Sequence, residues 1–176
     1  MEEKVFETIE LPQGFKASIE KNVLNISGNN KEISKSFSFS AAKAEVKDDK
    51  IVVYQLDKRK KSKAEAGSIA SHIKNMIKGI EKGFTYKLEI VYSHFPLNVS
   101  VKNGFVEINN LGGAKHPKKA KIVGNTKVEV KGKEIIVSGN NKEDVGQTAA
   151  NMEVVTRIKG KDKRVFQDGI YIVSRE

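Results

Sequence analysis

The sequence predicts an α+β protein of two tandem duplicated domains, each a small antiparallel sheet packed with one helix. The first observation is an internal repeat, in which "FKASIEKNVLNISGN" from Phe15 aligns without a gap with "LNVSVKNGFVEINNL" from Leu97. The second is that each copy then runs through a short apolar strand into one helical pattern. One helix covering one face of a small antiparallel sheet is an α+β arrangement, and here it occurs twice.

Each copy begins with a predicted hairpin. Apolar and polar residues alternate up to a two-residue turn, Lys21 and Asn22 in the first copy and Asn103 and Gly104 in the second, and the alternation then resumes. This pattern gives a hairpin one buried face. Asn-Gly is the stronger turn signal, because both central residues of a type I′ turn need a positive φ.

A short apolar strand follows each hairpin, at residues 50–54 and 134–138, and a helix follows each strand. In the first helix Ser62 precedes Glu65 by three residues, the spacing of a capping box, and Asn141 stands at the start of the second. Apolar residues then recur along one face of the helices, at Ala66, Ile69, Ala70, Ile73, Met76, Ile77 and Ile80 and at Val145, Ala149, Met152 and Val155.

Both helices carry a glycine at the same place, Gly67 and Gly146. A glycine inside a helix costs roughly 1 kcal/mol relative to alanine. Its recurrence predicts close packing of each helix against its sheet.

A further strand is predicted after each helix, at residues 84–92 and at residues 164–173, where Asp168-Gly169 interrupts the second as a turn signal. We expect the two domains to span residues 1–82 and 83–176. The boundary should lie within residues 80–95, and "SHFP" is the favoured connection because helix is disfavoured before proline.

The charge of the chain favours a polyanionic partner. Lys and Arg number 32 against 22 Asp and Glu, which gives a formal net charge of +10. The sequence has no run of roughly 18 apolar residues, and its start "MEEKVFETIE" lacks the features of a signal peptide, so we expect a cytoplasmic chain without a membrane partner. It has no cysteine.

No motif predicts an active site. His72, His94 and His116 are isolated from one another, and Gly112-Gly113 lacks the flanking pattern of a nucleotide site. We therefore expect no catalytic residue, metal, cofactor or small-molecule substrate. Asp162 and Asp168 are better explained by salt bridges or turn hydrogen bonds.

Three basic segments stand on predicted loops or element ends, at residues 58–63, 115–121 and 159–164. Loops held by a rigid sheet can present such charge to phosphates, which contributes affinity rather than sequence readout. Aromatic residues are sparse near these segments, so we expect structured RNA and no stacking platform for single strands. Solvated charge runs remain the alternative for any one segment.

Two stretches carry a resemblance. "VGQTAANMEVVTRIKGKDKRVFQDGIYIV", at residues 145–173, resembles the helix and closing segment of the L6 family of large-subunit ribosomal proteins, in its archaeal and eukaryotic form. "INNLGGAKHPKKAKI", at residues 108–122, looks like the preceding RNA-facing loop of that family. The resemblance covers nearly the whole chain and is stronger in the second copy.

The resemblance implies a structural constituent of the large ribosomal subunit and not an enzyme. It implies binding to large-subunit rRNA near the base of the factor-binding stalk and the sarcin-ricin region, chiefly through the second copy, beside neighbouring ribosomal proteins. In this sequence, the RNA-binding candidates are Lys115, Lys118, Lys119, Lys121, Lys159, Lys161, Lys163 and Arg164. The other positions carried over are Leu111, Gly112, Asp168 and Gly169.

The loop departs from the family at two places. Gly113-Ala114-Lys115 stands where the family usually has Gly-Glu-Lys, and Lys118 stands where arginine is frequent. Lysine cannot reproduce a bidentate arginine contact. The alternative function is a protein interaction module with a basic surface, which would depend on exposed apolar residues and not on the loop charges.

Overall fold

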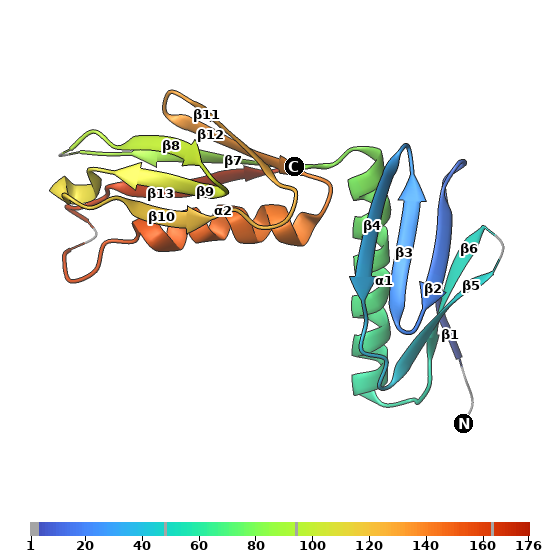
Figure 1. Cartoon of the computed structure of the whole chain (residues 1–176). Helices are drawn as coiled ribbons and strands as arrows, with labels where there is room; N and C mark the ends of the chain where they lie inside the picture. Colours follow the sequence, from blue (N-terminus) through green and yellow to red (C-terminus); the bar gives the residue numbers. More distant parts are fainter. Residues whose placement is uncertain (1–3, 48, 94, 163) are drawn as a thin grey trace. The chain divides into compact units, whose positions relative to one another are not determined.

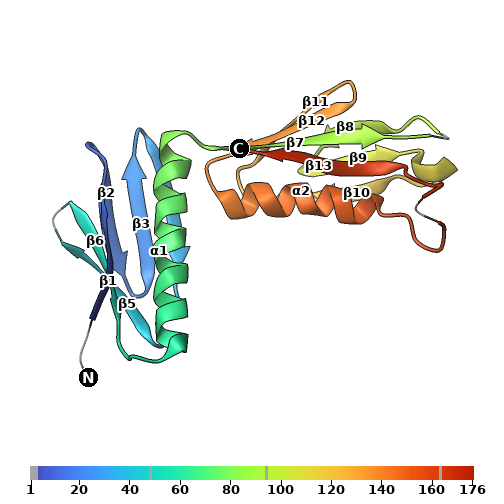
Figure 2. The same cartoon turned by 180° about the vertical axis from the view of Figure 1, so that it is seen from behind.

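The computed structural model describes residues 4–47, 49–93, 95–162 and 164–176. The chain divides into two compact units, Met1–Lys82 and Gly83–Glu176. Each unit joins one long helix to antiparallel strands, which confirms the predicted duplicated α+β class (Figures 1 and 2).

The first unit consists of two three-stranded antiparallel sheets and one helix. The sheets have the strand orders β1-β6-β5 and β2-β3-β4, and the helix contacts both sheets. The apolar face of the helix packs against the sheets as predicted, and its Ile73 and Ile80 are fully buried in the core of the unit. The elements are β1 (Lys4–Glu10), β2 (Lys16–Glu20), β3 (Val23–Gly28), β4 (Lys31–Ser36), β5 (Ala42–Lys47), β6 (Lys50–Gln55) and α1 (Lys60–Glu81).

The second unit repeats this plan with one additional strand. Its sheets have the orders β11-β12-β7-β13 and β10-β9-β8, and the helix α2 packs against strands of both. Val145, Ala149 and Met152 of α2 are fully buried. The elements are β7 (Phe84–Val91), β8 (Asn98–Lys102), β9 (Phe105–Asn109), the 3-10 turn η1 (Leu111–Gly113), β10 (Lys118–Lys121), β11 (Lys127–Lys131), β12 (Glu134–Gly139), α2 (Lys142–Thr156) and β13 (Gly169–Arg175).

The two repeat hairpins form at the predicted turns. Lys21 and Asn22 have φ values of 43° and 71°, and Asn103 and Gly104 have φ values of 48° and 76°. Positive φ at both central residues is what a type I′ turn requires, so turn chemistry sets the register of both hairpins.

The strand predicted after the first helix, at residues 84–92, forms, but it does not close the sheets of the first unit. β7 lies in the second unit between β12 and β13, where Leu88 stands opposite both Ile135 and Ile172. It corresponds to β1 of the first unit, which pairs with β6 in the same way. The units therefore meet at Lys82, and the described residues of the "SHFP" segment lie inside the second unit.

The predicted capping box of the first helix is wrong. α1 begins at Lys60, so Ser62 lies inside the helix, where its hydroxyl donates to the Ala41 carbonyl at 2.5 Å. The Glu65 carboxylate accepts from the Ser40 amide and hydroxyl, each at 2.7 Å, and from the Ala41 amide at 3.1 Å. These hydrogen bonds hold the segment before β5 against the helix and lower the pKa of Glu65 against the opposing effect of burial.

Asn141 caps the second helix as predicted, because its side chain accepts from the Glu143 amide at 3.1 Å. The helix glycines, however, do not reflect close packing. A Cβ atom on Gly67 would lie 3.6 Å from the Phe6 ring, and one on Gly146 would lie 3.8 Å from the Tyr86 ring. These are ordinary contact distances, so both sites have room for alanine.

Gly146→Ala should therefore stabilise the second unit by about 0.5–1 kcal/mol, because alanine restricts the unfolded chain and is the better helix former. Gly139→Ala is the matched control, since its Cβ would lie only 2.9 Å from a Val145 methyl carbon and should destabilise the unit. Urea unfolding followed by circular dichroism measures both. A loss of stability in Gly146→Ala would mean that the helix approaches its sheet more closely than these distances state.

Candidate nucleic-acid interface

The loop between β9 and β10 exposes the first predicted basic segment of the second unit. Leu111 is buried and anchors the 3-10 turn, while Gly112 and Gly113 have φ values of 58° and 80°, a region that favours glycine. Lys115 follows on the exposed loop. In β10 only Ala120 points into the core, so the lysines on either side of it remain exposed.

The second basic segment forms a loop fastened at both ends. α2 ends at Thr156, whose buried hydroxyl accepts from the Ile170 amide at 3.0 Å and donates to the Met152 carbonyl at 2.9 Å. At the other end, a side-chain oxygen of buried Asp168 accepts from the Ser93 amide at 2.6 Å. Residues 157–168 therefore bridge α2 and β13, and the strand begins only at Gly169.

These two segments lie at the same end of the second unit. The Lys118 ammonium donates to the Val155 carbonyl at 3.2 Å, near the end of α2. One turn earlier, the Asn151 side-chain amide donates to the Lys121 carbonyl at 2.9 Å. Figures 1 and 2 both show η1 and the loop after α2 at this end. The fold thus gathers charges that are about 40 residues apart in sequence into one surface.

Several of the candidate cations already have partners. The Lys119 ammonium lies 3.3 Å from a carboxylate oxygen of Glu107, which also pairs with Lys102 at 3.5 Å. The hydrogen bond from Lys119 is the largest cause of the lowered pKa of Glu107. This pair is partly shielded, because only 18% of the Glu107 side chain is exposed.

Arg164 and Lys161 are also engaged. The Arg164 guanidinium donates to both oxygens of Asp162, at 3.2 and 3.1 Å, and these bonds hold the pKa of Asp162 below its usual value. The Lys161 ammonium lies 4.3 Å from the centroid of the Phe166 ring. Asp162 and Asp168 therefore have the structural roles that the sequence predicted, an ion pair and a hydrogen bond at a turn.

Lys115, Lys121 and Lys159 are exposed, and in the described part of the chain their ammonium groups have no ion-pair partner. Arg157 shares this property and was not predicted from the sequence; it stands two residues before the second basic segment, at the C-cap of α2. Lys163 lies outside the described residues. Exposed cations without an ion-pair partner can bind anionic groups.

The basic segment of the first unit has a different setting. It surrounds the start of α1, where Arg59 pairs with Asp57 at 3.0 Å. Within the described ranges, no three His, Asp or Glu side chains gather as a metal site would require. No helix in those ranges is long and apolar enough to cross a membrane.

The family model described as "Ribosomal protein L6" matches residues 11–83 and 95–169. The chain belongs to the ribosomal protein L6 family. This confirms the resemblance, and membership of L6 makes the chain a structural protein rather than an enzyme.

Relatives match this L6 chain over nearly its full length. The protein named "Large ribosomal subunit protein uL6" from Methanosarcina mazei is 47% identical over 99% of both chains. Its namesake from Methanobrevibacter smithii is 45% identical over 97% of this chain and 96% of its own. A third, from Sulfurisphaera tokodaii, is 46% identical over 98% of this chain and 93% of its own.

Proposed function

We propose that this chain is a structural constituent of the large ribosomal subunit and binds large-subunit rRNA through its second unit. The names of its relatives support the ribosomal part of the proposal. The rRNA part is carried by one observation, the gathering of Lys115, Lys121, Arg157 and Lys159 as exposed cations at one end of that unit. The proposed contact is near the stalk base and the sarcin-ricin region, beside the ribosomal proteins found there.

The proposed mechanism is phosphate neutralisation with release of counterions. A lysine that neutralises a phosphate releases a condensed counterion, so binding weakens as salt rises. The residues that already have partners would position the loops. Lys118 is hydrogen-bonded to the Val155 carbonyl and Arg164 to Asp162, and these contacts would hold the unpaired cations in place. Lysine suits this use as a point charge without a required planar geometry.

Binding to an rRNA fragment that contains the sarcin-ricin region should fall steeply with salt. With four or more phosphate contacts, we expect a slope of log affinity against log salt of about −3.6 or steeper. Filter binding at several salt concentrations measures this slope, and an unrelated RNA hairpin of equal length is the control. Binding that ignores salt would contradict the mechanism, and equal binding to both RNAs would contradict the proposed position on the subunit.

A further inference from the structure

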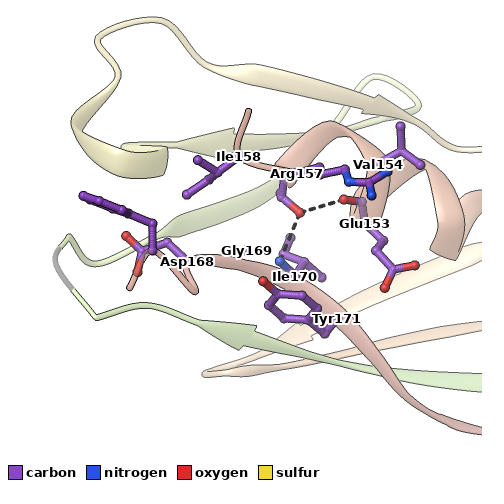
Figure 3. Close-up of a pocket in the computed structure, with 10 residues that line it drawn as sticks. Glu153, Val154, Arg157, Ile158, Asp168, Gly169, Ile170 and Tyr171 are labelled. Carbon is purple, nitrogen blue, oxygen red and sulfur yellow. Dashed lines mark hydrogen bonds between the residues drawn. The ribbon is translucent and has the colours of Figure 1, made fainter. Parts of the chain in front are cut away.

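A hollow of about 380 Å³ opens beside the end of α2, between that helix, the loop after it and the start of β13 (Figure 3). The volume is typical of sites for small organic groups and far exceeds the space of a single water. The residues that line it are Glu153, Val154, Thr156, Arg157, Ile158, Phe166, Asp168, Gly169, Ile170 and Tyr171. It belongs wholly to the second unit, at the end where the free cations gather.

Part of the wall of the hollow is apolar and aromatic. Figure 3 draws Ile158 on one side and Tyr171 on another, with Gly169 and Ile170 between them. Tyr171 is 43% exposed as a residue, and its hydroxyl donates to the Gln167 carbonyl at 3.0 Å, which fixes the ring in place. A Cβ on Gly169 would lie 3.4 Å from that ring, an ordinary contact distance, so Gly169 lies directly beside Tyr171.

The polar groups at the hollow are the hydrogen-bonded Thr156 hydroxyl, the buried carboxylate of Asp168, one oxygen of which accepts from the Ser93 amide, and two charged side chains at the rim. The Thr156 hydroxyl accepts from the Ile170 amide at 3.0 Å, and its own hydrogen is shared between the Met152 carbonyl and the Glu153 carbonyl, the latter at 3.2 Å; the dashed lines of Figure 3 mark the contacts with Ile170 and Glu153. At the rim, Arg157 can hold a phosphate, whereas the exposed carboxylate of Glu153 repels one. An uncharged ring can lie in the hollow beside Glu153 while the phosphate attached to that ring lies at Arg157.

We propose that this hollow holds one unpaired nucleobase of the bound rRNA, stacked on Tyr171, with its phosphate at Arg157. Unpaired bases of RNA are commonly splayed out and stacked on aromatic side chains. The inference rests on the proposed rRNA binding and adds a second kind of contact to it. It also revises the expectation of no stacking site, since the fold brings Phe166 and Tyr171 to a hollow that their sparse distribution in the sequence did not predict.

The test compares Tyr171→Ala with Tyr171→Phe on the same rRNA fragment. Loss of the ring should lower affinity about 5- to 150-fold, since base stacking on one aromatic residue contributes about 1–3 kcal/mol. The salt slope should stay unchanged, because no phosphate contact is lost, whereas Arg157→Gln should lower it by about one. Tyr171→Phe keeps the ring and should bind within about threefold of the wild type.

Chemical probing of the same complexes locates the base. With dimethyl sulfate, one unpaired base protected by the wild type and by Tyr171→Phe should become reactive with Tyr171→Ala. Val173→Ala is the matched control, because Val173 is an exposed apolar residue of the same strand that does not line the hollow. Ile158→Ala, on another wall, provides a second variant if Tyr171→Ala unfolds.

The outcomes separate this inference from the proposed function. If the wild type binds and Tyr171→Ala or Ile158→Ala changes neither affinity nor reactivity, the hollow holds no base and the inference is overturned, while rRNA binding stands. The same result is expected if another protein covers the hollow. If the wild type does not bind the fragment, the proposed function fails and the inference fails with it.

Discussion

Changing Lys115, Lys121, Arg157 and Lys159 together to alanine should lower the affinity for the rRNA fragment about 100- to 1,000-fold at roughly 0.15 M salt. Each side chain is exposed and unpaired in the described part of the chain, so each substitution removes one phosphate contact. The slope of log affinity against log salt should become shallower by about three to four. The free energy of unfolding should change little, because surface substitutions of this kind usually stay within about 0.5 kcal/mol each.

The matched control removes four lysines from the first unit, Lys58, Lys60, Lys61 and Lys63. It deletes the same charge from the whole chain and leaves the second unit intact, so affinity and salt slope should stay near the wild-type values. An equal loss in both variants would mean that net charge alone governs binding. A larger loss of affinity in the control variant would mean that the main RNA contact lies at the start of α1.

Local signals predicted much of the fold. A type I′ turn depends on two adjacent residues, and Asn103 and Gly104 meet its requirement without help from the rest of the chain. The helix faces follow from the spacing of apolar residues within one segment, so most apolar positions of the buried faces were predictable, whereas Val155 is only partly buried and the buried Thr148 and Thr156 were not predicted. Asn141 likewise bonds only two residues ahead.

Long-range partners were not predictable in this way. The alternation in residues 84–92 predicts a strand but does not identify the neighbours of that strand, and β7 pairs with β12 and β13 about 50 and 80 residues away. Glu65 has the spacing of a cap, yet its carboxylate binds the backbone before β5, 24 residues earlier. In both cases a tertiary contact satisfies the group better than the local alternative.

In the candidate site, too, the sequence did not predict which charged side chains would have long-range partners. A count of lysines treats Lys119 and Lys121 alike, but Lys119 stands directly opposite Glu107 in the β9–β10 ladder and is paired there. Only the register of the two strands reveals this. The pair of Asp162 and Arg164 is two residues apart and was within reach of the sequence, whereas the free state of Arg157 depends on where α2 ends.

Thr156→Val should destabilise the second unit by about 1–3 kcal/mol. Valine has nearly the shape of threonine, so the packing stays, but the Ile170 amide loses its buried acceptor and the cost of an unsatisfied group follows. Thr156→Ser is the matched control, since it keeps the hydroxyl and loses only a methyl group. Urea unfolding should rank the proteins as wild type, then Thr156→Ser, then Thr156→Val.

This substitution also connects stability to binding. The Thr156 hydroxyl fastens the end of α2 to β13, and the loop between them carries Arg157 and Lys159. A loosened loop must be ordered when RNA binds, so Thr156→Val should bind more weakly even where it is fully folded, with its salt slope intact because its charges remain. If Thr156→Val were as stable and bound as tightly as the wild type, the hydroxyl would not be the group that holds the cations in place, and Asp168 at the other end of the loop would carry that role alone.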